Sequence, residues 1–346
     1  MPQTPRDVMT RSLTFQTPER IPRDLWTLPW ATTRYPADLA RLVARYPSDI
    51  VRPTDCGYRP FIRRQGDPYE LGKSIDDWGC VFESIHAGVH GEIRDPILPD
   101  LDNLAALQPP YEALPDNPRS ARDRINRFCA GTDFFVMANA CPRPWERYQF
   151  LRGSENALAD MAFPDEKPVQ TVLRMIQDFY LRELEFWVST DVDAIMFMDD
   201  WGSQNSLLIP PQTWREIFRP LYKAYCDLAK ANGKFVFMHS DGYILDIYRD
   251  LADIGVHAIN SQLFCMDLAR IAAEAKGRIT FWGEIDRQHI LCDPDPEAGR
   301  AAVRQVVKHL YDPRGGIIAQ LEFGPGCNPG NVMAVYEEWE QIKSKN

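Results

Sequence analysis

Polar and ionisable side chains stand where several apolar runs of the sequence end. The runs 193–200, 234–241, 257–262, 278–286 and 316–323 begin apolar and finish polar or acidic. Strands that are buried on both faces should otherwise stay apolar, so these ends are candidates for chemistry or for capping the next helix. They carry Asp199, Asp200, His239, Asp241, Gln262, Glu284, Asp286 and Glu322. Carboxylates and imidazole can exchange protons with a substrate or bind a divalent metal.

The pattern of secondary-structure elements that would position these side chains predicts a parallel β-barrel surrounded by helices. From about residue 166, short apolar runs alternate with amphipathic helical stretches, and the runs 20–26, 48–53 and 132–140 raise the strand count to that of a closed (β/α)8 TIM barrel. We expect one domain over residues 1–346. The strings DDWGCVFES and HGEIRDPI predict a β-hairpin excursion before the third strand. Catalytic side chains of such barrels come from the C-terminal ends of the strands.

Composition and charge limit the partners and the compartment. The chain has 346 residues and a net charge of -10 without a basic patch, which makes nucleic acid an unfavourable partner. No segment has the length and apolar character of a signal peptide or a membrane span, so we expect a cytoplasmic protein without membrane contact. The eight cysteines have no paired spacing and should remain thiols. A small molecule or another protein is the expected partner.

Four segments carry a family resemblance over nearly the whole chain. They are MTRSLTFQTPERIPRDLW, DDWGCVF, FMDDWGSQNSLLIPPQTWREIFRPLYKAYCDLAKANGKFVFMHSDGYI and FWGEIDRQ. In this order they resemble the uroporphyrinogen-decarboxylase superfamily. The resemblance implies a (β/α)8 barrel, often a homodimer, whose members include the porphyrinogen decarboxylase and methyltransferases that work with a corrinoid protein.

The segment after the first strand favours the methyltransferase branch. The decarboxylase carries Met-Arg-Gln-Ala-Gly-Arg there, and its arginines would hold the carboxylates of the substrate. The corresponding segment here reads RDLWTLPWATTRYP and lacks the paired arginines. Because anions are costly to desolvate without fixed cations, the resemblance indicates a corrinoid-dependent methyltransferase, with decarboxylation as the alternative.

The same resemblance implies a zinc site. Methyltransferases of this branch carry His-X-Cys at the fifth strand and a third ligand, typically Cys, at the last strand. This chain has His239 and Asp241 in the first motif. Alignment of the last strand places Glu322 at the third position, with Cys327 as a substitute. Side chains two apart on a strand point to the same side, so His239 and Asp241 can share one ion.

Hard ligands would change the preferred substrate. Imidazole and carboxylates leave zinc a harder Lewis acid than thiolates do, and such an ion favours an oxygen ligand. The hard ligands therefore predict O-demethylation of a small, possibly methoxylated aromatic methyl donor. The family resemblance implies that the methyl group passes to a corrinoid carried by a separate protein. Asp199 is the predicted general acid, pointing into the mouth, while Asp200 should face the helices. Glu284 is predicted as a catalytic partner or an alternative ligand.

Aromatic side chains gather near the same strand ends. Trp26, Trp30, Trp201 and Trp282, with Tyr243, are the predicted wall for a planar substrate, although tryptophans also fill large cores. Two further alternatives stay open. His239 and Asp241 could hydrogen-bond without a metal, and the barrel could bind a small molecule without catalysis.

Overall fold

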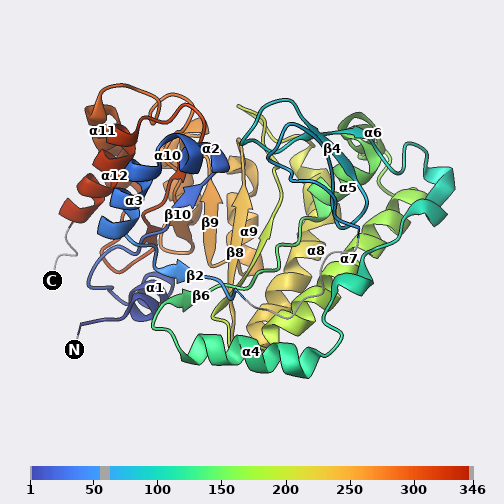
Figure 1. The fold of residues 1–346 in the computed structure, drawn as a ribbon, viewed down its shortest axis with the longest axis horizontal. Helices are drawn as coiled ribbons and strands as arrows, with labels where there is room; N and C mark the ends of the chain where they lie inside the picture. The colour runs from blue at the N-terminus through green and yellow to red at the C-terminus, as the bar shows by residue number, and fades with distance from the viewer. Residues whose placement is uncertain (1, 55–62, 343–346) are drawn as a thin grey trace.

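The apolar runs of the sequence pair in parallel around a closed barrel in the computed structural model, which describes residues 2–54 and 63–342 (Figure 1). The barrel strands are β1 (Trp26–Thr27), β2 (Ile50–Val51), β6 (Phe135–Val136), β7 (Ala194–Met198), β8 (Phe235–Ser240), β9 (Ala258–Ser261), β10 (Thr280–Trp282), β11 (Ile317–Ile318) and β12 (Glu322–Phe323). Each of the predicted runs contributes to this set, and β11 and β12 are successive parts of the last run.

Backbone pairing closes the ring. Strands β7, β8, β9, β10 and β11 form one parallel sheet in that order, β2 pairs with β6, and β1 pairs with β12. A parallel bridge between Met137 and Ala194 joins β6 to β7. On the other side, the amide of Asp49 donates to the carbonyl oxygen of Arg23 at 2.8 Å, which links the first run to the second. The predicted TIM barrel is confirmed.

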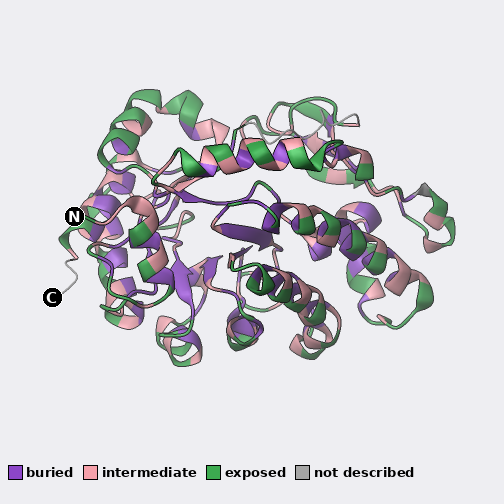
Figure 2. Ribbon diagram, turned by 90° about the horizontal axis from the view of Figure 1, so that it is seen from below, coloured by how far each residue is buried: buried purple, intermediate pink, exposed green. Residues whose placement is uncertain are grey.

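Helices surround the strands and turn their buried faces inward (Figure 2). Proline in the first turn begins most of them, where its missing N–H costs no helical hydrogen bond. They are α1 (Pro5–Leu13), α2 (Pro29–Arg34), α3 (Pro36–Arg45), α4 (Pro118–Ala130), α5 (Pro144–Arg152), α6 (Ser154–Asp160), α7 (Lys167–Val188), α8 (Pro211–Ala231), α9 (Tyr248–Ile254), α10 (Leu268–Ala275), α11 (Pro296–Leu310) and α12 (Pro329–Gln341). Short 3₁₀ turns are η1 (Leu101–Ala106), η2 (Tyr111–Ala113), η3 (Leu245–Ile247) and η4 (Leu263–Cys265).

The predicted hairpin excursion lies between β2 and β6. It is a three-stranded antiparallel sheet, in which β4 (Val81–Ser84) pairs with β3 (Gly72–Ile75) on one side and β5 (Glu92–Asp95) on the other. The Phe82 ring lies 5.1 Å from the Phe150 ring of α5. The excursion is therefore packed on the helical layer, and it contains one strand more than predicted.

Alternation along the strands separates two cores. Ala194 and Met196 of β7 face the barrel interior, whereas Ile195 and Phe197 face the helices. Met9 of α1 belongs to the interior cluster, so α1 fills the N-terminal end of the barrel. The C-terminal end is left for the site.

Two further predictions concern whole-chain properties. No helix in the described ranges is long and apolar enough to span a bilayer. The cysteines at positions 80, 129, 141, 226, 265, 292 and 327 are free thiols, as predicted. Cys56 lies outside the described residues.

Candidate active site

Strand β8 brings two predicted ligands to the barrel mouth. Phe237 faces the interior, and the period of two places His239 and then Asp241 on the same side. The hydroxyl of Ser240 points the other way and accepts a hydrogen bond from the Trp201 amide at 3.1 Å. Sequence reasoning thus predicted the geometry of this motif.

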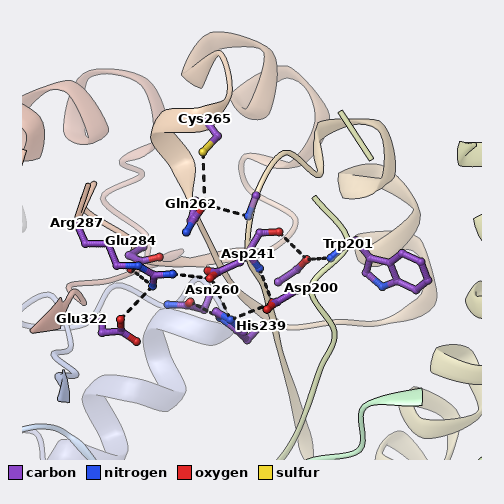
Figure 3. Close-up of polar contacts among 12 residues, drawn as sticks. Asp200, Trp201, His239, Asp241, Asn260, Gln262, Cys265, Glu284, Arg287 and Glu322 are labelled. Carbon is purple, nitrogen blue, oxygen red and sulfur yellow. Dashed lines mark hydrogen bonds and ion pairs between the residues drawn. The ribbon is translucent and has the colours of Figure 1, made fainter. Parts of the chain in front are cut away.

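His239 meets two carboxylates at the mouth (Figure 3). Its Nε2 lies 3.4 Å from Oδ1 of Asp200 and 3.7 Å from Oδ1 of Asp241. One donor atom from each of the three residues falls within 4.8 Å of the other two. Oδ1 of Asp241 is buried and has no hydrogen-bond partner within the described ranges. One imidazole nitrogen and two carboxylate oxygens therefore face a common point.

Asn260 of β9 fixes the orientation of the imidazole. Its Oδ1 lies 2.7 Å from Nδ1 of His239, while its Nδ2 donates to the Trp282 carbonyl at 2.6 Å and to Oε1 of Gln320 at 2.9 Å. Because Nδ2 is used as a donor, Oδ1 is the acceptor, and Nδ1 of His239 carries the hydrogen. Nε2 is then the nitrogen available to a metal. We did not predict Asn260; a polar residue inside the buried run 257–262 was its only signal.

The carboxylates control the charge of the imidazole. Burial lowers the pKa of His239, but the hydrogen bond and charge of Asp200, with the charge of Asp241, outweigh burial and raise this pKa to about 10. For Asp200, burial raises the pKa of the carboxyl group. The hydrogen bond and charge of His239 outweigh burial and bring this pKa below its usual value. A metal that binds Nε2 must therefore displace a proton.

The predicted orientations of Asp199 and Asp200 are reversed in the structure. Asp199 is fully buried toward the helices, where its carboxylate accepts from the amides of Trp145 at 3.0 Å and Glu146 at 2.7 Å and from the Tyr222 hydroxyl at 2.6 Å. Asp200 faces the mouth with 44% of its side chain exposed. The alternation that turns Met196 inward also turns Asp199 outward, so Asp199 anchors the start of α5 and cannot reach a substrate in the mouth.

Arg287 stands where Glu322 was expected to bind the metal. Its guanidinium lies 2.5 Å from Oδ2 of Asp241, 2.8 Å from Oε1 of Glu284 and 3.3 Å from Oε1 of Glu322. Glu322 is paired with this cation and does not join His239 and Asp241; the third residue whose ligand atom lies close to theirs is Asp200. Cys327 is also outside the cluster: it is buried, and its thiol faces the Glu322 carbonyl at 3.7 Å.

Comparison with known proteins places this barrel in a family. Residues 84–342 match the family model of uroporphyrinogen decarboxylase (URO-D). The chain belongs to the URO-D family. This confirms the resemblance found in the sequence and makes the protein a member of an enzyme family. No curated protein matches the chain.

A solved methyltransferase structure confirms the fold of this URO-D family member. A methyltransferase from Methanosarcina mazei superposes with a TM-score of 0.69 at 14% identity, covering 98% of this chain and 99% of that chain. An endo-beta-1,4-xylanase from Gloeophyllum trabeum has a TM-score of 0.41 at 11% identity, covering 98% of this chain and 100% of that one. At 14% identity the likeness to the methyltransferase concerns the fold alone, and function depends on the site.

Glu284 is the most buried of the three acids that contact Arg287, the other two being Asp241 and Glu322. It is 2% exposed, and its Oε2 has no hydrogen-bond partner among the residues that the structure describes. Burial raises the pKa of Glu284 to about 8, against the opposing charge of Arg287. Glu284 also lines a small cavity with Gln262 and Cys265. These two residues lie above the cluster in Figure 3. A protonated acid is thereby available near the mouth at neutral pH.

Two of the predicted aromatic residues lie at the cluster. The Trp26 ring is half-buried and lies 5.1 Å from the His239 ring and 5.1 Å from the Trp282 ring. Both indole N–H groups donate to Oδ2 of Asp24, at 3.1 and 3.0 Å. Trp282 is buried in the interior, so only Trp26 offers an accessible face beside the histidine. Tyr243 is half-buried on the loop after β8.

The other predicted aromatic residues lie elsewhere. Trp201 is fully buried between barrel and helices, stacked on Trp145 at 5.1 Å, and its N–H donates to the Tyr222 hydroxyl at 2.8 Å. Its placement in a substrate wall is wrong, because it belongs to the core. Trp30 lies on α2 against Tyr35, at a surface groove and not at the cluster.

Proposed function

We propose that this URO-D family protein is a metal-dependent methyltransferase that removes the methyl group of a small methoxylated substrate and passes it to a corrinoid carried by a separate protein. The observation that carries the proposal is the cluster of Asp200, His239 and Asp241 at the barrel mouth. The methyltransferase with the same fold supports it, since that protein is a full-length structural match.

The donor set fits a catalytic zinc ion. Such sites use three protein ligands from His, Asp, Glu or Cys and leave a fourth position for water or substrate. The orphaned Oδ1 of Asp241 is explained if it is a ligand, since buried oxygens rarely lack a partner. Asn260 supplies the hydrogen bond that commonly orients a metal-bound histidine.

The surrounding residues suit an oxygen substrate. Zinc with hard ligands supplies a Lewis acid that can polarise an ether oxygen. Asp200 and Asp241 hold negative charge close to His239, and Arg287 balances the charge of Asp241. Trp26 presents an apolar face beside His239 for a planar ring. Glu284, protonated at neutral pH, is the proposed proton donor to the leaving oxygen.

Decarboxylation is the second candidate, because the family model itself is named for that reaction. A decarboxylase of this family would act without metal or partner, and a barrel that only binds a small molecule would perform neither reaction. The three functions therefore differ in metal content and in product.

Metal content and methyl transfer together test the proposal. We expect about one zinc per chain in protein purified without added metal, with loss of zinc in His239→Ala. His289→Ala is the matched control, since His289 lies on a neighbouring loop with 79% of its side chain exposed. With reduced cobalamin and a series of methoxylated aromatics, the zinc protein should form methylcobalamin. Zinc-free protein that consumes uroporphyrinogen would replace the proposal with decarboxylation.

A further inference from the structure

Glu183 of α7 is a carboxyl group without a cationic partner. It lines a cavity of about 300 Å³ between the excursion sheet, α5 and α7. Within residues 2–54 and 63–342, Glu183 makes no hydrogen bond and no ion pair. Burial and the negative charge of Asp77 raise its pKa, and no arginine offsets them. Because a carboxylate is costly to desolvate without a cation, this end of the cavity favours a positively charged ligand.

The arginines of the cavity wall are already paired with acids. The three pairs are Arg64 with Asp77 at 3.0 Å, Arg147 with Asp76 at 2.5 Å and Arg143 with Glu146 at 3.8 Å. Each pair compensates its own charge, so Glu183 supplies the uncompensated charge of the wall when it is ionised. A cation is therefore a better match to this cavity than an anion.

Aromatic rings form the wall beside Glu183. Phe179 and Tyr180 precede it on α7 by four and three residues, so all three side chains lie on one face of the helix. The Trp78 ring lies 5.2 Å from the Phe179 ring and 6.0 Å from the Tyr180 ring, and all three rings line the cavity. The faces of such rings attract cations. The Arg147 guanidinium already lies over the Trp78 ring at 5.0 Å, which leaves Phe179 and Tyr180 for a ligand.

We propose that this cavity binds a compact organic ammonium ion, with its charge against the Glu183 carboxylate and its alkyl groups against the Phe179 and Tyr180 rings. Such an ion fits both features of the wall, because it combines a positive charge with apolar surface, and aromatic side chains recognise it in other proteins. The cavity has the volume of a small-molecule site.

This site is separate from the proposed metal site. Asp200, His239 and Asp241 form the metal cluster, and none of them lines the cavity. The inference therefore goes beyond the proposed function and does not depend on it.

Choline and its neutral isostere 3,3-dimethylbutan-1-ol test the inference, because they have the same shape and differ in charge. Both are titrated calorimetrically into the protein as purified, at about pH 8, above the pKa of about 7 that burial gives Glu183. Choline should bind at least about tenfold more tightly than the alcohol, equivalent to about 1.4 kcal/mol. Glu183→Gln should remove most of this preference, and Glu183→Asp should keep part of it. Glu185→Gln, exposed on the same helix, is the matched control and should leave the preference unchanged.

A second variant tests the aromatic wall without changing the charge. Phe179→Leu keeps an apolar side chain but removes the ring face, so it should weaken the binding of choline more than that of the alcohol. Equal binding of choline and the alcohol by the unaltered chain would overturn the inference, and so would an unchanged preference in Glu183→Gln. A preference for choline that depends on Glu183 would uphold the site even in a protein without zinc or methyl transfer, in which case the proposed function alone fails.

Discussion

Asp199 and Asp200 are neighbours with opposite surroundings, and exchanging either for asparagine should separate stability from metal binding. Asp199→Asn replaces one of two carboxyl oxygens that accept from two amides and a hydroxyl by an NH₂ donor, so we expect a loss of about 1–3 kcal/mol in the free energy of unfolding with zinc retained. Asp200→Asn should keep most stability and lose zinc. Urea titration and elemental analysis of both variants measure the two effects. Zinc loss in Asp199→Asn alone would mean that the cluster is wrongly assigned.

Asp241 stands where the methyltransferase resemblance implies a cysteine, so Asp241→Cys tests the role of hard ligands. We expect zinc to remain, because thiolate is a good zinc ligand, and the rate of ether demethylation to fall, because thiolate makes the ion a weaker Lewis acid. The variant also removes the partner of Arg287 at 2.5 Å, so Arg287→Gln serves as a control for that loss. Equal or faster ether cleavage by Asp241→Cys would contradict the argument.

The ends of β7 and β8 are held together by a contact between two glycines. An added Cβ at Gly242 would lie 2.1 Å from the Gly202 carbonyl oxygen, and one at Gly202 would lie 2.2 Å from the Tyr243 amide nitrogen. Real side chains do not approach this closely, so one loop would have to move. Asp200 and Asp241 flank these glycines, and the spacing of the metal cluster therefore depends on this contact between loops.

Gly242→Ala should consequently impair folding and zinc affinity together. Gly242 has φ +75°, a conformation that alanine adopts at a cost, and the clash with Gly202 adds to it. Gly233→Ala is the matched control: its φ is +67°, but no atom lies within 4 Å of the added Cβ. Both variants should lose about 1 kcal/mol or more of stability. Only Gly242→Ala should bind zinc more weakly in a chelator competition, and equal affinities would contradict the role of the contact.

At the scale of elements, the sequence was sufficient to predict which side chains share a face of a strand, because side chains alternate with a period of two. The alternation along β8 predicted that His239 and Asp241 share a side. The same rule counted from Met196 would have turned Asp200 inward, and the assignment of Asp199 failed because the rule was not applied there. Glu322 depended on a different kind of information: Arg287 reaches it from the loop after β10, and no local pattern predicts a contact between those loops.

At the scale of the whole molecule, the apolar runs predicted the barrel because each strand can be recognised from consecutive residues of the sequence. Long-range charge pairing could not be predicted in this way. Arg287, for example, contacts Asp241, Glu284 and Glu322, which follow three different strands and come together only in the closed barrel. Asn260 likewise acquires its role only when β8 and β10 lie on either side of β9.

Buried acids outside the cluster make the stability of the whole chain depend on pH. Burial, and to a lesser degree the charge of Asp77, raises the pKa of Glu183 on α7 from 4.5 to about 7. Between those values the unfolded chain releases this proton while the folded chain keeps it. The stabilising contribution is therefore complete below about pH 4.5 and is lost as the pH rises through about 7. Tyr180 and Arg143 line the same cavity and stay unchanged in the test.

Glu183→Gln should abolish this part of the pH dependence, because a neutral amide does not titrate. In urea unfolding with a chelator present, the variant should lose less stability than the unaltered chain between about pH 5 and about pH 8, by about 1–3 kcal/mol. Glu185→Gln, exposed on the same helix, should behave like the unaltered chain. If Glu183→Gln and the unaltered chain lose the same free energy over this range, Glu183 is ionised in the folded protein at neutral pH, and the argument that burial raises its pKa to about 7 is wrong.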